Sequence, residues 1–344
     1  MMGFWGKLKK PIMVLAPMAD VTDCAFRQII AKYGKPDVFY TEFVSADGLA
    51  HPKAREKLLI DLKYGKNEHP IVAQIFGGKP ENIKEAARLC AELGFDGIDI
   101  NMGCPDKAVE KQCAGAAMMK NPKLAREIIR AAKEGAGGLP ISVKTRIGYN
   151  PARKPSASNG AGKNDYLLEV EWIKVLLSED LSALIVHLRT RKEMSDVPAH
   201  WELMKRIVEI RDEMGKETLI IGNGDAVSIE DARTKCQETG CDGVMLGRAI
   251  FGNPWLFETL RKSDIRKLAD VRLTQEHLGV LVEHTKLFEE MLGAHKNFAI
   301  MKKHYKAYVN GFDGAKELRM KLMEAENAGE VENTINDFLA TLTL

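Results

Sequence analysis

The chain has 344 residues, of which 45% are apolar and 28% are charged. This length suffices for one large domain and a smaller one, and the composition is that of an ordinary globular protein rather than a fibrous or disordered one. The 50 basic and 48 acidic residues give a net charge of +2, which by itself neither requires nor excludes a nucleic-acid partner.

The first segment, residues 1–18, lacks the long apolar run of a signal peptide, and no later stretch reaches the length of a membrane span. We therefore expect a cytoplasmic protein that does not contact a membrane. A reducing compartment also fits the cysteines, which show neither a CxxC pair nor the spacing of a disulfide framework. The six cysteines are Cys24, Cys90, Cys104, Cys113, Cys236 and Cys241.

Eight short apolar runs predict strands, at residues 12–17, 38–44, 71–76, 97–101, 141–145, 184–187, 219–222 and 244–246. The runs are continuous rather than alternating, which is typical of parallel strands covered on both faces. Helical signals separate them, including the first-turn prolines Pro80 and Pro122 and a capping box at residues 228–231. Eight strand–helix units predict an α/β fold, the (β/α)8 TIM barrel. An open doubly wound sheet is disfavoured because no GxGxxG fingerprint follows the first run.

Two segments differ from this alternation. Residues 150–164 are rich in Gly, Ser, Pro and Lys and predict a long mobile loop after the fifth strand. Beyond residue 254 the strand signal stops, and residues 273–292, 298–309, 314–326 and 331–342 read as amphipathic helices. The predicted domains are therefore a barrel over residues 1–255 and a C-terminal α-helical bundle over residues 256–344.

Polar residues gather at the predicted C-terminal ends of the strands, where (β/α)8 barrels carry their chemistry. The residues at these ends, most of them polar, are in chain order Pro17, Met18, Gln74, Asn101, Cys104, Lys144, Arg146, His187, Arg189, Asn223, Gly224, Asp225, Gly247 and Arg248. Such groups are costly to bury without partners, so a bound ligand is the economical explanation. Residues 222–224 and 247–248 predict a phosphate site, because glycine lets the backbone approach an anion; plain turn glycines are the alternative.

Several of these side chains allow more than one role. Lys144 is a Schiff-base nucleophile, a fixed cation facing an electron-rich ring, or an outward lysine. Gln74 suits the edge of a flavin or pyrimidine ring, or a bond to the backbone. Cys104, in a loop that no packing argument requires, is a nucleophile or a proton donor, whereas Cys113 is a redox partner or a small packing residue.

His187 is a general base, a hydrogen-bond donor to phosphate or flavin, or a core histidine. The other histidines form no HExxH or paired His/Cys pattern, so we expect no catalytic metal.

The motifs at these positions resemble those of the tRNA-dihydrouridine synthases. They are residues 16–27, 41–45, 74–77, 99–105, 143–148, 186–190, 222–225 and 245–248. Residues 301–304 and 312–319 resemble the bacterial B-type branch, so the resemblance covers nearly the whole chain. Two positions depart from the family pattern: Leu188 replaces the glycine of His-Gly-Arg-Thr, and Tyr149 replaces a tryptophan ahead of a loop that is usually shorter.

The resemblance implies FMN at the barrel mouth and NADPH as reductant. The cofactor-binding residues it implies are Pro17, Met18, Gln74, Lys144, His187, Asn223, Gly224, Asp225, Gly247 and Arg248. Asn101, Lys144 and Arg146 would hold a flipped uracil, and Cys104 would be the general acid. The helical tail would bind tRNA, and no obligatory protein partner is implied.

Lys302, Lys303, His304 and Lys306 form a basic run on one predicted tail helix, which is either a phosphate-contacting cluster or a solvated helix face. Three other functions are weighed. A flavin barrel acting on a free pyrimidine would not need the tail, and a catalytically silent tRNA-binding protein would not need Cys104 and Lys144. A Schiff-base aldolase using Lys144 is the third.

Overall fold

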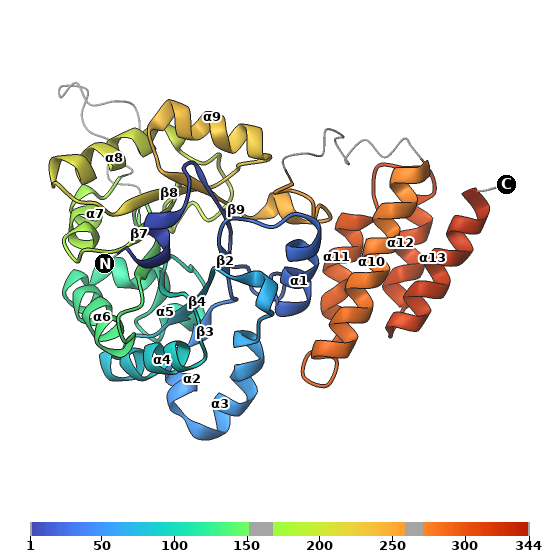
Figure 1. Ribbon diagram of the computed structural model, residues 1–344, viewed down its shortest axis with the longest axis horizontal. Coiled ribbons are helices and arrows are strands. Elements are labelled where there is room, and N and C mark those ends of the chain that lie inside the picture. Colours follow the sequence, from blue (N-terminus) through green and yellow to red (C-terminus); the bar gives the residue numbers. More distant parts are fainter. Residues whose placement is uncertain (1, 151–167, 259–270, 343–344) are drawn as a thin grey trace. The chain divides into compact units, whose positions relative to one another are not determined.

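The computed structural model describes residues 2–150, 168–258 and 271–342. Apart from Asn150, the loop predicted over residues 150–164 lies outside the described residues. In the described parts, the chain forms a parallel barrel surrounded by helices, and a second, helical unit (Figure 1).

The strands are all parallel and follow one another in the order β1-β9-β8-β7-β6-β5-β4-β2, with β3 beside β4. Their bounds are β1 (Ile12–Leu15), β2 (Phe39–Tyr40), β3 (Val44–Ser45), β4 (Ile71–Phe76), β5 (Gly97–Met102), β6 (Ile141–Arg146), β7 (Ala183–His187), β8 (Leu219–Asn223) and β9 (Gly243–Leu246). A bridge between Val14 and Val38 joins the two ends of this path. The predicted TIM barrel is confirmed.

The second predicted strand is interrupted. Tyr40 at the end of β2 pairs with Val72, and Val44 at the start of β3 pairs with Ile75. Between these two pairs the chain advances four residues from β2 to β3, whereas the partner strand β4 advances only three. One extra residue on one strand is a bulge, which breaks the ladder and splits the run in two.

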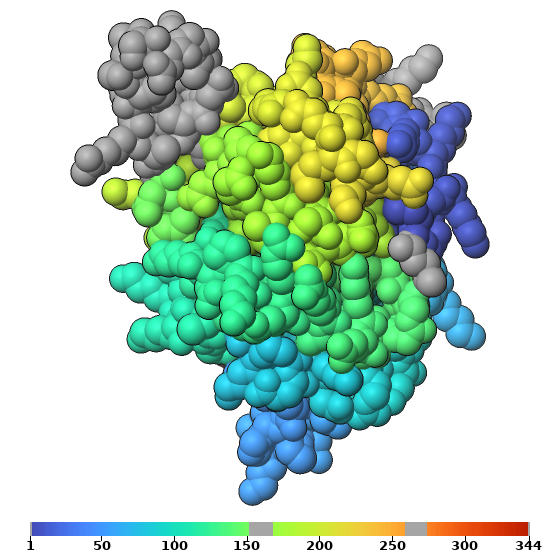
Figure 2. All heavy atoms as spheres, turned by 90° about the vertical axis from the view of Figure 1, so that its left-hand side faces the viewer, coloured from blue at the N-terminus to red at the C-terminus, as the bar shows by residue number. Residues whose placement is uncertain are grey.

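Helices follow the strands around the barrel. They are α2 (Ala46–Ala50), α3 (Pro52–Leu58), α4 (Pro80–Glu92), α5 (Lys107–Glu110), α6 (Pro122–Gly135), α7 (Val170–Leu177), α8 (Met204–Glu213) and α9 (Ile229–Thr239), with short 3-10 turns η1 (Gly3–Lys7) and η4 (Gly115–Lys120). On α6 the buried residues Ala125, Ile128, Ile129 and Ala132 repeat at helical spacing, which gives the helix one apolar face. Figure 2 shows the side of the barrel unit where α6, α7 and α8 form a closely packed cover.

The predicted helix starts are confirmed. Pro80 and Pro122 occupy the first position of α4 and α6, and the Asn121 side chain accepts from Leu124 N at 3.2 Å. Ser228 caps α9, because its Oγ accepts from Asp231 N at 3.1 Å. A side-chain cap of this kind typically contributes about 1 kcal/mol.

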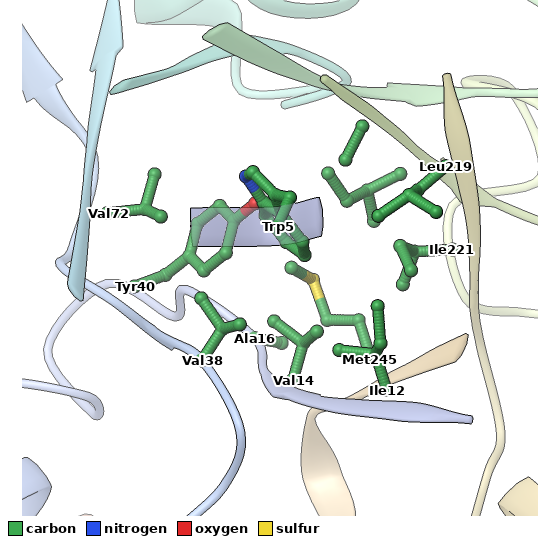
Figure 3. Packing of buried hydrophobic residues seen from close by; sticks show 12 residues of the cluster. Trp5, Ile12, Val14, Ala16, Val38, Tyr40, Val72, Leu219, Ile221 and Met245 are labelled. Carbon is green, nitrogen blue, oxygen red and sulfur yellow. The ribbon is translucent and has the colours of Figure 1, made fainter. Parts of the chain in front are cut away.

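An apolar cluster fills the interior of the barrel around Trp5 of η1 (Figure 3). Its members come from the inward positions of the strands: Ile12, Val14, Ala16, Val38, Tyr40, Val72, Ala183, Ile185, Leu219, Ile221 and Met245. Side chains alternate between the two faces of a strand, so the next inward position lies two residues further along. The side chains two residues beyond the cluster members, at the C-terminal ends of the strands, therefore also face the interior of the barrel.

The described residues divide into two compact units. The barrel unit is formed by residues from Met1–Pro17, Pro36–Leu62 and His69–Gly247, and the helical unit by residues from Met18–Lys35, Lys63–Glu68 and Arg248–Leu344. The second unit contains α1 (Cys24–Tyr33), η3 (Lys66–Glu68), η7 (Arg248–Ile250), η8 (Phe298–Ile300), α10 (Val271–Leu292), α11 (Met301–Tyr308), α12 (Ala315–Glu324) and α13 (Ala328–Leu342). The predicted helices of the tail are present. The domain boundary between residues 255 and 256 stays a prediction.

Early residues belong to the helical unit because α1 binds its C-terminal helices: Lys32 Nζ and the Tyr33 hydroxyl both donate to Glu283 of α10 at 2.6 Å. A buried ion pair in turn ties residues 63–68 to α1. Arg27 of α1 is fully buried, and its Nε donates to Glu68 Oε2 at 2.6 Å. Its two other nitrogens donate to the carbonyls of Thr22 and Lys63 at 2.7 and 2.6 Å. None of the described helices is both long and apolar enough to cross a membrane.

Candidate active site

Polar side chains replace the apolar core at the C-terminal ends of the strands. Gln74 of β4, His187 of β7 and Asn223 of β8 each lie two residues beyond a member of the interior cluster. They therefore continue the inward face of their strands. On β5 and β6 the pairing of Asp99 with Ser142 and of Asn101 with Lys144 brings four polar residues to adjacent positions.

Gln74 and Asn101 bind each other. Gln74 is fully buried, and its Oε1 accepts from Asn101 Nδ2 at 3.0 Å, while its Nε2 donates to Asp99 Oδ2 at 2.7 Å. Asn101 Oδ1 accepts from the backbone nitrogens of Gly103 and Cys104 at 3.1 and 2.9 Å. Each side-chain amide has further hydrogen-bonding capacity, since a carbonyl oxygen accepts twice and an NH₂ group donates twice.

Asp99 is a buried acid that sequence reasoning did not single out. Its Oδ1 accepts from Ser142 Oγ at 2.6 Å, and Ser142 Oγ lies 3.2 Å from the hydroxyl of Tyr40. Burial raises the pKa of Asp99 to about 7, although the hydrogen bonds from Ser142 and Gln74 and the Lys144 ammonium act in the opposite direction. A signal was available in the sequence: Asp99 stands between Ile98 and Ile100, inside a run that predicts a buried strand.

Cys104 lies in the loop between β5 and α5 and is half-buried. Burial raises the pKa of its thiol; the backbone hydrogen bond from Asp106 and the cations Arg146 and Lys144 oppose this rise. The thiol is therefore protonated at neutral pH. The loop is closely fitted, because a Cβ on Gly115, whose φ is +59°, would lie 2.6 Å from the Cys104 carbonyl oxygen. Cys113 is exposed, so the expectation that it is a small packing residue is wrong.

Lys144 and Arg146 differ in how their charges are satisfied. Arg146 is buried, and it donates to the carbonyls of Gly103, Thr190 and Met194 at 2.9, 3.1 and 3.0 Å. Lys144 is half-buried and makes no hydrogen bond or ion pair with any described residue. Burial and the Arg146 charge lower the pKa of Lys144 to about 8. Of these two cations, Lys144 is the one whose donors the described protein leaves unused.

His187 is held by Arg189. Arg189 Nη1 lies 3.2 Å from His187 Nε2, and since a guanidinium only donates, Nε2 accepts and the ring proton sits on Nδ1. Arg189 Nη2 binds Asp225 Oδ2 at 2.5 Å, and Ala199 N donates to the same oxygen at 2.8 Å. The carboxylate of Asp225, which the family resemblance assigns to cofactor binding, thus holds Arg189 and the backbone.

The glycine-rich turn after β8 is tightly enclosed. Gly224 has a φ of +130°, and a Cβ there would lie 2.8 Å from the Cβ of Ala199. Its carbonyl accepts from Trp201 Nε1 at 2.8 Å, and Asn223 Nδ2 donates to the Met245 carbonyl at 2.8 Å. Gly247 follows β9 and is half-buried.

The remaining predicted cofactor residues follow β1 and β9. Pro17 and Met18 come directly after β1 and are half-buried, and Met18 N donates to Thr22 Oγ1 at 2.8 Å. Arg248 opens η7 and is exposed. Met18 and Arg248 belong to the helical unit, whereas Pro17 and Gly247 belong to the barrel unit.

Tyr149, where the chain departs from the family pattern, lies beside two cations. The Lys120 ammonium is 3.8 Å from the centre of its ring, and the Arg191 guanidinium is 5.6 Å away. Arg191 is itself fixed by Glu110, with N–O distances of 2.9 and 2.6 Å. Leu188, the second departure, is fully buried.

The basic run of the tail lies on α11. Lys302 is half-buried, Lys306 is exposed, and exposed Lys303 pairs with Asp20 at 3.1 Å. His304 is fully buried between the rings of Phe26 and His284. The expectation that His304 contacts phosphate is therefore wrong, because its ring faces the interior of the helical unit.

In residues 2–150, 168–258 and 271–342, no group of three or more His, Cys, Asp or Glu side chains is placed to hold a metal ion. The family model described as "Dihydrouridine synthase (Dus)" matches residues 14–343. A "Probable tRNA-dihydrouridine synthase" of Staphylococcus aureus (strain N315) is 39% identical over 340 residues, covering 98% of this chain and 96% of that protein. The "Probable tRNA-dihydrouridine synthase 2" of Bacillus subtilis (strain 168) is 40% identical over 336 residues, covering 97% and 96%.

A solved structure of 2-naphthoyl-CoA reductase with 2-naphthoyl-CoA is similar to this chain with a TM-score of 0.52 and 12% identity. The match covers 76% of this chain and 51% of that one. At this level of identity the likeness shows a shared fold.

Proposed function

The chain belongs to the dihydrouridine synthase family, whose members are flavin-dependent oxidoreductases, and on this premise we propose that it reduces the C5–C6 double bond of uridines in tRNA. We propose FMN as the flavin and NADPH as the reductant. One observation carries the proposal: the unpaired Lys144 ammonium lies beside Asn101 and the protonated Cys104 thiol, on neighbouring strand ends of the barrel.

The described residues fit a flavin phosphate and ring. Asn223 ends β8, Gly224 comes directly after it and Gly247 follows β9, the strand ends at which (β/α)8 barrels commonly hold phosphate through backbone N–H groups. Lys144 has unused donors and a positive charge, which suit an electron-rich ring. His187 carries its ring proton on Nδ1, which makes that atom a donor. Bound FMN, reduced by NADPH, would supply the hydride that C6 of the uracil receives.

The side chains of β5 and β6 are proposed to hold the uracil. Hydride addition at C6 leaves negative charge on the conjugated C5 and O4 atoms. The Lys144 and Arg146 cations stabilise that charge, and they act strongly because they are removed from bulk water. Asn101 offers its remaining amide capacity to the ring edge.

Cys104 is proposed as the general acid. Its thiol gives a proton to C5, so that one hydride and one proton complete the two-electron reduction of the double bond. A raised thiol pKa suits this role because the acid must be protonated at working pH before it donates.

The substrate is a macromolecule rather than a free base. A uridine must leave its stack to reach the strand ends, at a cost of a few kcal/mol that is smaller in an already unpaired loop. Lys302 and Lys303 of the helical unit are proposed to contact tRNA phosphates. Contacts of this kind supply affinity without sequence information.

The test separates the two half-reactions. We expect Cys104→Ala to let NADPH bleach the bound flavin at a near-normal rate, since the thiol takes no part in that step. Reoxidation of the flavin by tRNA is expected to slow by about 10²–10⁴-fold, the usual loss for one positioned acid. Stopped-flow absorbance of the flavin measures both rates.

Cys113→Ala is the matched control, because it removes a thiol nine residues away that is exposed. Both half-reactions of this variant are expected to match the wild type. Normal tRNA-dependent reoxidation in Cys104→Ala, together with a slow reaction in Cys113→Ala, would show that the wrong acid has been named. Reduction of free uridine by the wild type at the rate seen with tRNA would favour the small-molecule alternative.

A further inference from the structure

Three hydrogen bonds that involve the side chains of Asn101, Gln74 and Asp99 form a series with one direction, from the Cys104 loop to Asp99. The backbone nitrogen of Cys104 donates to Asn101 Oδ1 at 2.9 Å, and Asn101 Nδ2 donates to Gln74 Oε1 at 3.0 Å. Gln74 Nε2 then donates to Asp99 Oδ2 at 2.7 Å. Every donor in this series is turned toward Asp99, three links away from the Cys104 loop.

A second series reaches Asp99 from the other side. Ser142 Oγ donates to Asp99 Oδ1 at 2.6 Å. A serine hydroxyl has one hydrogen, which is used in this bond. Tyr40 is therefore the donor in its 3.2 Å contact with Ser142 Oγ. Both series end at the same carboxylate, and all the side chains involved are buried.

The carboxylate is what gives the series its direction. A side-chain amide can be turned by 180° with little change in shape, whereas the Asp99 carboxylate, ionised above its pKa of about 7, only accepts. Asp99 therefore requires the nitrogen of Gln74, which leaves the Gln74 oxygen for Asn101 and the Asn101 oxygen for the Cys104 backbone. Turning either amide would place two donors or two acceptors face to face in a buried site, where an unsatisfied polar group destabilises the fold.

We propose that Asp99 is a positioning residue that fixes the orientation of the Gln74 and Asn101 amides and, through Asn101, holds the loop that carries Cys104. The inference rests on the proposed function, in which Gln74, Asn101 and Cys104 face the flavin and the uracil. The negative charge of Asp99 also attracts the neighbouring Lys144 ammonium, which forms no hydrogen bond or ion pair with any described residue.

The first test uses Asp99→Asn in the flavin-loaded, full-length protein. The variant keeps the shape of the side chain but offers a donor as well as an acceptor, so Gln74 and Asn101 lose their fixed direction. We expect the Cys104 backbone amide to exchange its hydrogen at least about tenfold faster, because its bond to Asn101 Oδ1 is no longer enforced. Hydrogen-exchange mass spectrometry on peptides that contain residues 103–104 measures this without tRNA.

Ser142→Ala is the matched control. It removes the other donor to Asp99 but leaves the carboxylate, so protection of the Cys104 amide is expected to stay within about twofold of wild type. Exchange within β6 serves as a check on the barrel in both variants.

The second readout is kinetic. We expect Asp99→Asn to lower kcat for tRNA reduction by about tenfold to a hundredfold, the loss typical of a misplaced reacting group, while KM for tRNA stays unchanged. Flavin reduction by NADPH is expected to stay near normal. A general loss of structure would lower kcat and the rate of flavin reduction together and would raise KM for tRNA.

A double variant keeps the inference testable if Asp99→Asn does not fold. In Asp99→Asn with Asn101→Asp, the carboxylate moves to position 101, where it accepts from the Cys104 amide and from Gln74 Nε2. Gln74 then turns its oxygen toward position 99, and every group has a partner again. We expect protection of the Cys104 amide to return while tRNA reduction stays impaired, since Asn101 itself has been replaced.

The outcomes separate the inference from the function on which it rests. Unchanged exchange at Cys104 in Asp99→Asn, with unchanged kcat, overturns the positioning role even if the wild type reduces tRNA. Lost protection in Asp99→Asn and its return in the double variant support the role. A wild type with protected Cys104 that fails to reduce tRNA overturns the proposed function instead.

Discussion

At the scale of single residues, the charge of Lys144, a residue of the candidate active site, destabilises the folded state. Its ammonium is half-buried with no partner among the described residues, and its pKa falls to about 8 from an ordinary value of 10.5. Between these two values the unfolded chain binds more protons than the folded chain, so Lys144 disfavours the folded state below pH 8. The penalty fades as the pH rises from about 8 toward 10.5.

We therefore expect Lys144→Met to raise the melting temperature of flavin-free protein at pH 7 while abolishing tRNA reduction. The gain should shrink as the pH rises toward 10.5, because the wild-type lysine then begins to lose its proton in the unfolded state as well. Differential scanning calorimetry at pH 7 and pH 10 measures it. Lys123→Met, at an exposed position, should leave the melting temperature unchanged at both values. A lower melting temperature for Lys144→Met at pH 7 would mean that Lys144 has a partner that stabilises its charge.

The residues of the candidate site were predictable where strand alternation applies. Gln74, Asn101 and Lys144 could be placed at the strand ends because the apolar run of each strand fixes its position. The partners of these residues could not be predicted, since Asp99, Ser142 and Tyr40 meet only when three separate strands are paired. The same holds for Asp225, whose carboxylate binds Arg189 across 36 residues of sequence.

At the scale of elements, α11 has a buried face within a run of sequence that is mostly basic. Its buried residues Met301, His304, Tyr305 and Tyr308 follow the spacing of a helix face buried on one side. The lysines between them are left on the other side. Helical periodicity thus separates His304 from Lys302, Lys303 and Lys306, although all four are adjacent in a run that reads as polar.

Neutralising the three lysines of α11 is expected to weaken tRNA binding. Each phosphate contact adds about 0.7–0.9 to the slope of log K against log salt, so the variant Lys302→Gln/Lys303→Gln/Lys306→Gln should flatten that slope by about 2. Filter binding across a salt series measures it, and NADPH-dependent flavin reduction should not change. Lys321→Gln, on exposed α12 sequence, is the control. An unaltered slope would place the tRNA contacts elsewhere.

At the scale of the whole molecule, the two compact units could be predicted only in part. The eight-strand pattern predicts the barrel, and the four amphipathic segments predict the helices of the tail. That α1 and residues 63–68 pack within the helical unit could not be predicted, because it depends on pairs far apart in sequence: Arg27 binds Glu68, and Lys32 and Tyr33 bind Glu283. Sequence periodicity carries no information on such pairs.

The two units also contain buried groups that respond oppositely to acid. In the barrel unit, Asp99 has a pKa raised to about 7 from 3.8, so the folded state binds the extra proton and gains stability as the pH falls through this window. In the helical unit, burial lowers the pKa of His304 from 6.5 to about 3, and that of His284 falls well below 6.5. There the unfolded state binds the protons, and stability is lost as the pH falls below 6.5.

We therefore expect acid to open the helical unit before the barrel unit. The ring nitrogens of His284 and His304 have no hydrogen-bond partner among the described residues, and the two rings lie 4.6 Å apart, so a proton on either ring is poorly accommodated. The charge of Lys303 further lowers the pKa of His304, and His304 further lowers the pKa of His284. Hydrogen exchange measured between pH 7 and pH 4 should show protection factors that fall in α10 and α11 while β4–β8 stay protected. His304→Phe should flatten this pH dependence, because an apolar ring can pack against Phe26 and Phe251 without titrating. The control is His295→Gln at an exposed position, which should leave the pH dependence unaltered. Equal loss of protection in both units at the same pH would show that the buried histidines do not set the acid limit of the helical unit.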